Sequence, residues 1–303
     1  MKKVSAIDRT YRCFIESLVH SKIPCLYWSR VPKDKKHGGD LAPSNADLSS
    51  SSSVRIARQW ARRLEAHLGL ELAVLSGKRD GQRVGRAFEM IVARFVDQSF
   101  SALISARPGI WKTYGLKQVP KISHFCQYEH LGELERVLEN SRELEASLGS
   151  GHIIKPDIVL SRSPILDDEL EILTGTAVSE GAKRTILRRD YNPKEILHGS
   201  ISVKWTFRSD RAQNARSEAL NLIRNRKDRT PHIVVVTAEP APSRIGSVAL
   251  GTGDIDCVYH IALDALIEAT ESVDAGDAYD NLKMMVDGRR LKDIRDLPYD
   301  LIV

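Results

Sequence analysis

Residues 200–219, SISVKWTFRSDRAQNARSEA, change from an alternating pattern to a helical one within a single short segment. Residues 200–207 alternate between polar and apolar side chains, which predicts a strand. The helical pattern that follows predicts a helix over residues 210–226. Beyond it, the apolar run in residues 232–238 predicts another strand. A strand, a helix and a further apolar strand in this order favour an α/β fold with a central mixed sheet flanked by helices.

The alternation in the first strand places Ser202, Lys204 and Thr206 on one face and the apolar side chains on the other. A polar face has two interpretations. It belongs to an edge strand with one solvated side, which is the simpler reading of this motif alone, or to a site where the lysine carries chemistry.

A strand predicted over residues 152–160, HIIKPDIVL, makes the second interpretation more attractive. Asp157 lies in its apolar run, where an unpaired carboxylate is costly to bury unless a cation is bound. Asp157, Glu218 and a main-chain carbonyl such as that of Val203 supply the hard oxygen ligands that Mg²⁺ prefers. Lys204 would then polarise an attacking water or neutralise charge on a phosphorane. An ion pair between Asp157 and a Lys or Arg stays open as a structural alternative.

The run RSDR, residues 208–211, suits the recognition of G·C base pairs. Arginine pairs bidentately with guanine, and a carboxylate accepts from cytosine N4, which gives roles to Arg208, Asp210 and Arg211. If the helix begins near Asp210, Arg211 and Glu218 share a face and lie about 10 Å apart along the axis. Base recognition and phosphate chemistry would then be mechanically linked. The alternative is an ordinary helix start, with Asp210 favouring the helix dipole and the arginines solvated.

The rest of the chain completes a single domain over residues 1–303. We expect an N-terminal helical layer over about 1–150, a catalytic and recognition core over about 150–263, and a C-terminal helical segment over 264–303. Further elements are predicted from periodicity and turn residues: a loop ending in a helix N-cap at 32–53, helices at 54–68 and 84–100, and a strand at 256–263. Glu89 lies on the border of the apolar stripe of the second of these helices. The acidic run in 167–171 predicts a solvated helical face and not a metal site.

Composition limits the class of protein. The chain has 45 Lys and Arg against 40 Asp and Glu, a net charge of +5, which suits a polyanion such as double-stranded DNA without requiring one. Its four cysteines occur singly, without the spacing of a zinc site or a disulfide framework. Charged residues interrupt any signal-peptide core after the N-terminus, and no apolar run approaches membrane-spanning length. A soluble, cytoplasmic protein is expected.

Taken in order, these motifs resemble the NgoMIV-type restriction endonucleases, in the CCGG-cutting group of the PD-(D/E)xK nuclease superfamily. The resemblance is carried by Pro156-Asp157, Ser202-Val203-Lys204, Arg208-Ser209-Asp210-Arg211, Glu218, NLIRNRK and PHIVVVTAEP. It is strongest over residues 150–245 and weaker around 80–95, and it does not extend to the first 50 or last 40 residues. It implies the restriction-endonuclease-like core of that superfamily.

The resemblance also implies roles for individual residues. Asp157 and Glu218 would be carboxylates of a Mg²⁺ site, Lys204 the catalytic lysine and Glu89 a further acidic member. Ser202 stands where the superfamily usually has a carboxylate, and in this group Glu218 supplies the missing charge from the helix.

The resemblance implies a recognition set as well. Arg208, Asp210 and Arg211 would read the central CCGG in the major groove. Gln82 and Arg244 match positions that contact the outer base pair, although an exposed loop residue is an equally good interpretation of both. Members of this type are homotetramers, two back-to-back dimers, in keeping with the two-fold symmetry of a palindromic site. We therefore expect a type II restriction endonuclease that cuts a GCCGGC-like site, depends on Mg²⁺ and leaves 5′ overhangs.

Two other functions fit the same residues. One is a repair or recombination nuclease of the same superfamily that cuts without reading sequence, which discrete fragments would exclude. The other is a non-catalytic, sequence-specific DNA-binding protein in which Asp157 and Lys204 only form a buried ion pair. A methyltransferase is disfavoured, because no glycine-rich strand-to-helix turn suits a nucleotide-like cofactor.

Overall fold

The computed structural model describes residues 5–33, 38–140, 154–251, 253–273 and 275–303. They form a mixed α/β fold around a six-stranded sheet with the order β4-β5-β6-β7-β8-β9. The strands are β4 (Trp111–Tyr114), β5 (Ile158–Arg162), β6 (Ile196–Lys204), β7 (His232–Thr237), β8 (Cys257–His260) and β9 (Leu291–Asp293). β4, β5 and β6 are antiparallel neighbours, whereas β6 to β9 run parallel. The predicted fold class is confirmed.

β6 is the central strand of this sheet and the one that positions the candidate site. Residues 196–203 are buried, and Lys204 is the first partly exposed residue of the strand. β6 pairs with β5 on one side and β7 on the other, so both of its edges are hydrogen-bonded. The interpretation of this segment as an edge strand is therefore wrong, and the polar side chains at its carboxyl end need another explanation.

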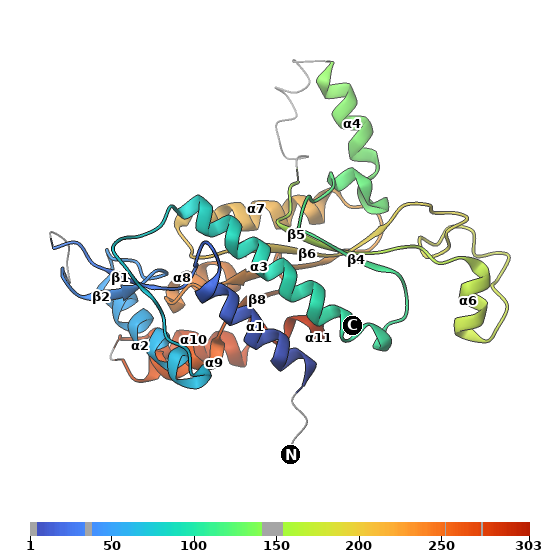
Figure 1. The fold of residues 1–303 in the computed structure, drawn as a ribbon. Coiled ribbons are helices and arrows are strands. Elements are labelled where there is room, and N and C mark those ends of the chain that lie inside the picture. Colours follow the sequence, from blue (N-terminus) through green and yellow to red (C-terminus); the bar gives the residue numbers. More distant parts are fainter. Residues whose placement is uncertain (1–4, 34–37, 141–153, 252, 274) are drawn as a thin grey trace.

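Two helices cross the near face of the sheet in Figure 1, α1 (Ala6–His20) and α3 (Gly81–Ser101). They pack on each other, and α3 also contacts β6. The apolar stripe of α3 carries Phe88, whose ring meets the indole of Trp205 edge-on, with 4.9 Å between ring centroids. This contact places α3 against the end of β6, because Trp205 directly follows the strand.

The remaining elements surround this core. The other α-helices are α2 (Ser51–Leu68), α4 (His130–Glu139), α6 (Asp167–Thr174), α7 (Ser209–Asn225), α8 (Pro242–Ala249), α9 (Leu263–Glu271), α10 (Ala278–Asp287) and α11 (Leu297–Leu301). Short 3-10 helices occur at Ile104–Ala106, Cys126–Tyr128 and Ile122–His124. A small sheet of order β2-β1-β3 is built from β1 (Trp28–Arg30), β2 (Leu41–Pro43) and β3 (Val74–Leu75). The described chain contains no helix that is both long and apolar enough to span a membrane.

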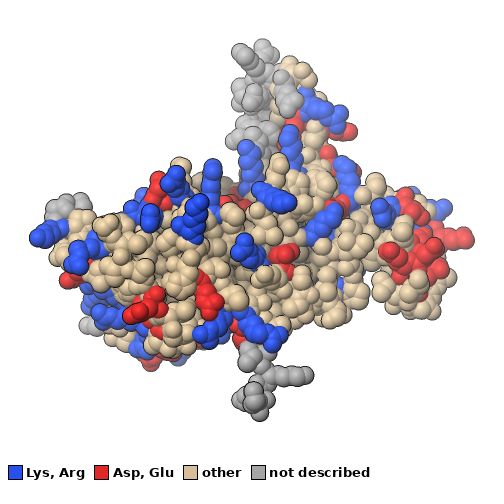
Figure 2. Space-filling view, viewed as in Figure 1, with Lys and Arg blue, Asp and Glu red and all other residues tan. Residues whose placement is uncertain are grey.

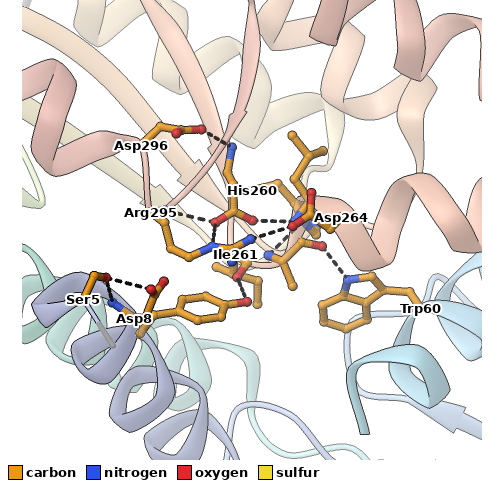
Figure 3. Close-up of polar contacts among 12 residues, drawn as sticks. Ser5, Asp8, Trp60, His260, Ile261, Asp264, Arg295 and Asp296 are labelled. Atoms are coloured by element: carbon orange, nitrogen blue, oxygen red, sulfur yellow. Dashed lines mark hydrogen bonds and ion pairs between the residues drawn. The ribbon is translucent and has the colours of Figure 1, made fainter. Parts of the chain in front are cut away.

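Buried hydrogen bonds fasten the N-terminal helices to the sheet at the ends of β8 and β9 (Figure 3). The Tyr11 hydroxyl donates to the carbonyl of Ile261 at 3.0 Å, and the Trp60 indole donates to that of Ala262 at 3.2 Å. Asp293 accepts from Leu263 N–H at 2.8 Å and from the Arg295 guanidinium at 2.6 Å. α1 and α2 are thus tied to a segment more than two hundred residues away in the sequence.

Two helices stand away from the core, α4 and α6 (Figure 1). None of the residues of α6 is buried, and its acidic side chains gather at one end of the molecule in Figure 2. The predicted solvated helix is confirmed, and Asp167 at its start pairs with Arg188.

Local patterns correctly predicted the elements that surround the candidate site. The predicted helices at 54–68, 84–100 and 210–226 correspond to α2, α3 and α7, and the side chain of Ser50 caps α2 by accepting from Ser53 N–H. The predicted strand at 152–160 begins only at Ile158, since Pro156 has no N–H to donate to a sheet; residues 152 and 153 lie outside the described ranges. β4 and the small sheet within residues 1–150, and β9 after residue 263, were not predicted. The proposed division of the domain stays a prediction.

Replacing Phe88 with Ala tests the packing of α3 on β6. The loss of a fully buried ring should lower the free energy of unfolding by about 3–5 kcal/mol, as measured by urea denaturation. Met90→Ala on the same helix is the control, because Met90 is half exposed and its loss should change stability by less than about 0.5 kcal/mol. Equal effects of the two changes would contradict this packing.

Candidate active site

Asp157 lies just before β5, beside the end of β6, because Ile158 pairs with Ile201 in the antiparallel register. One of its oxygens, Oδ2, accepts from Val203 N–H at 2.7 Å and from the Lys204 ammonium at 2.7 Å, and the Ser202 hydroxyl lies 3.4 Å away. The side chains of Asp157 and Lys204 are 20% and 19% exposed, so this ion pair is shielded from bulk water and open at one side.

Two further carboxylates share this electrostatic environment. Burial raises the pKa of Glu218, on α7, to about 7; the charge of Asp157 raises it as well, while Lys204 and a hydrogen bond with Ser202 lower it. The pKa of Glu89, on α3, is also raised, first by burial and then by the charge of Asp157. The structure therefore brings together the catalytic residues predicted from the sequence: Glu89, Asp157, Ser202, Lys204 and Glu218.

The chemistry of this donor set fits a hard divalent cation. Lys204 pairs with Asp157, and the pKa values of Glu89 and Glu218 are raised first by burial and then by the negative charge of Asp157. A bound cation would favour their ionised forms. Within the described part of the chain, no three His, Cys, Asp or Glu side chains converge as a preformed metal site. Lys204 instead contacts the Asp157 oxygen, and Val203, whose carbonyl was predicted as a ligand, contributes its N–H to that oxygen.

The predicted recognition residues lie at the start of α7, the helix that carries Glu218. Arg208 is its N-cap residue and Asp210 lies in its first turn, and both are exposed. Arg211 is in the same turn, but its side chain lies outside the described part of the structure. One helix thus joins the RSDR run to the carboxylate cluster.

The other two predicted DNA contacts are not loop residues, so that interpretation is wrong for both. Arg244 lies in α8, where its guanidinium donates to the carbonyl of Phe207 at 3.2 Å and forms an ion pair with Asp47. Gln82 lies in the first turn of α3, exposed and two turns before Glu89. The turn residues of the sequence did not show that α3 and α8 begin just before Gln82 and Arg244.

A hollow of about 380 Å³ beside the RSDR segment combines the predicted Arg208 and Arg244 with charged residues that the sequence did not reveal. Its lining includes Asp47, Lys78, Arg79, Arg208 and Arg244. The Lys78 ammonium donates to the carbonyl of Ala46 at 2.7 Å, and burial lowers its pKa. Asp47 and Lys78 belong to irregular N-terminal segments, where no periodicity marks a functional side chain.

Comparisons with known proteins agree on one family. The model of the NgoMIV restriction enzyme family matches residues 31–303. The chain is also 48% identical over 265 residues to the Type II restriction enzyme NgoMIV of Neisseria gonorrhoeae, an alignment that covers 86% of this chain and 90% of that protein.

The raised pKa of Glu218 predicts a stability change with pH. A carboxyl whose pKa is about 7 when folded and near its usual value of 4.5 when unfolded favours folding while protonated; this contribution is fully present below 4.5 and is lost as the pH rises to about 7. Without divalent ions, Glu218→Gln should therefore raise the free energy of unfolding at pH 8 by about 1–3 kcal/mol. Urea denaturation at pH 5 and pH 8 measures this. Glu169→Gln, on the exposed α6, should change neither value, and a Glu218→Gln variant that behaved the same way would contradict the assignment.

Proposed function

The chain belongs to the NgoMIV restriction enzyme family, and we propose that it cuts both strands of double-stranded DNA at a palindromic site containing CCGG. Membership of this family makes it a site-specific DNA endonuclease. The proposal further specifies the site GCCGGC, dependence on Mg²⁺ and products with 5′ overhangs. The observation that carries it is the cluster of Asp157, Lys204 and Glu218 beside the helix that begins with RSDR.

The positions of these side chains support the proposed catalytic roles. Asp157, Glu218 and the carbonyl of Val203 would hold Mg²⁺, which when bound supplies Lewis-acid stabilisation of charge on the phosphate. Lys204 already lies within hydrogen-bond distance of Asp157, where its ammonium would orient the attacking water or donate to a phosphate oxygen. Ser202 orients Glu218 through their hydrogen bond, and Glu89 adds negative charge from α3.

Sequence recognition would come from the start of α7 and from its neighbours. Arg208 and Arg211 suit guanine, and Asp210 suits cytosine N4. Arg244 and Gln82 would contact the outer base pair, from α8 and α3. Exposed arginines at positions 83, 86 and 94 of α3 add positive charge, and Figure 2 shows basic side chains gathered over this region.

A homotetramer made of two dimers is part of the proposal. A palindrome presents two equivalent half-sites, which a two-fold symmetric dimer matches. In addition, α6 exposes apolar side chains, with Ile172 82% and Leu173 52% exposed, which a protein partner would cover. A cytoplasmic location stays a prediction from the sequence.

The Asp157–Lys204 ion pair is also what a non-catalytic DNA-binding protein would require, so cleavage itself is the first test. A sequenced plasmid is incubated with and without Mg²⁺, and the ends of the products are mapped. We expect discrete ends within GCCGGC and none without the ion. Random degradation would remove the claim of specificity, and an intact plasmid in Mg²⁺ would favour the non-catalytic alternative.

Replacing Lys204 with Ala tests the catalytic assignment. The loss of a preorganised cation at the reacting phosphate should slow cleavage by about a hundred- to a thousand-fold and leave DNA affinity nearly unchanged. Single-turnover cleavage and filter binding measure the two quantities. The control is Lys121→Ala, a change in an exposed residue paired with Glu135, which should cut normally. Normal cleavage by the Lys204 variant would show that the lysine is not catalytic.

A further inference from the structure

Glu239 is a fully buried carboxylate that none of the roles above uses. It follows β7, in the run PHIVVVTAEP, and is 0% exposed. Its two oxygens accept from two different backbone groups: Oε2 from Phe207 N–H at 2.8 Å and Oε1 from Ala241 N–H at 3.0 Å. Burying a carboxylate is costly, and these two hydrogen bonds offset part of that cost.

The two N–H groups belong to the two segments that carry the proposed base contacts. Phe207 directly precedes Arg208 at the start of α7, and Ala241 is the N-cap residue of α8, which carries Arg244. Arg244 in turn donates to the carbonyl of Phe207. Both backbone groups of Phe207 are therefore held by residues 239–244.

Neighbouring contacts make this connection rigid. Ala238 N–H donates to the carbonyl of Trp205 at 3.2 Å, and the Asn45 side chain donates to the carbonyl of Ala238 at 2.7 Å. At the other side, Asp47 pairs with Arg244. Glu239 uses one side chain to bind the backbone just before α7 and at the N-cap of α8.

We propose that Glu239 is a positioning residue for sequence recognition, whose carboxylate fixes the start of α7 relative to α8 so that the RSDR segment and Arg244 engage one DNA site together. This inference rests on the proposed function, because it assumes that both segments contact bases. It assigns no contact with DNA to Glu239 itself.

The role requires the ionised carboxylate, because only that form accepts with both oxygens without presenting an O–H to an N–H. Burial raises the pKa of Glu239 to about 7; Arg244 on α8 lowers it, and Asp47 in the N-terminal loop raises it. His260 on β8 lies next to the Glu239 backbone, and burial keeps that imidazole neutral by lowering its pKa to about 4. Recognition should therefore weaken as the pH falls through about 7.

The test is a Glu239→Gln variant, which keeps the shape of the side chain but directs an amide N–H₂ at one of the two donors. Its affinity for a GCCGGC duplex, measured by fluorescence anisotropy without divalent ions, should fall by about tenfold, the loss expected for one hydrogen bond to a charged group. Its affinity for a duplex without CCGG should not change. The control is Glu195→Gln, in which a different buried glutamate, bound to Lys112, Ser161 and Tyr114 near β4, loses its charge. That control should discriminate between the duplexes as the natural protein does.

Discrimination that is unchanged in Glu239→Gln would overturn the inference, even if its melting temperature shifted, since a structural role alone moves only stability. A second measurement avoids any change at Glu239. In a Glu218→Gln background, which removes a second carboxyl whose pKa is raised to about 7, the ratio of specific to non-specific affinity should fall between pH 8.5 and pH 6. A flat ratio would contradict the inference. If the natural protein does not prefer the GCCGGC duplex at all, the proposed function fails first, and the positioning role fails with it.

Discussion

The structure depends on the hydrogen bonds that one oxygen of Asp157 accepts from Val203 N–H and Lys204. They join the start of β5 to the end of β6 at the point where β6 emerges from the core. A carboxylate held there by a backbone N–H and an ammonium group is fixed in position and is still partly open to solvent. Holding Asp157 in this position requires that β6 be paired on both edges. A strand paired in this way cannot shift its register without exposing its apolar side chains.

That constraint explains which parts of the molecule could be predicted. The strand, helix and strand at 200–238 follow from short-range periodicity, since burial on both sides of the sheet dictates the residue types locally. The edge strands β4 and β9 have four and three residues, which is too short for an alternating pattern to be recognised in the sequence. The clustering of Asp157 with Lys204 and Glu218 followed from the order of motifs, whereas the Asp47–Arg244 pair joins residues almost two hundred positions apart. No local signal encodes such a pair.

Two buried glutamates illustrate how similar pKa values arise from different physical situations. The pKa of Glu218 is raised first by burial and then by the charge of Asp157, which Lys204 offsets only in part. Glu239 has two N–H donors, and its raised pKa reflects burial in a place where the hydrogen bonds are already complete. The environment of Glu218 suits a site that binds a cation. The environment of Glu239 suits a structural connection, because its carboxylate needs no further ligand.

Under the proposed function, α7 is the element that joins the recognition residues to the carboxylate cluster. Arg208 is its N-cap residue and Asp210 lies in its first turn, and Glu218 lies two and a half turns beyond Ser209 on the same helix, about 14 Å along the axis. α7 contains no Pro or Gly that would kink it, so under the proposed roles a displacement of its first turn by DNA would also move Glu218. The first turn is in turn held by Phe207, whose N–H and carbonyl bind Glu239 and Arg244. The position of Glu218 relative to Asp157 and Lys204 therefore depends on where the start of α7 lies. Under the proposed roles, a wrong base sequence that shifted this start would also displace Glu218.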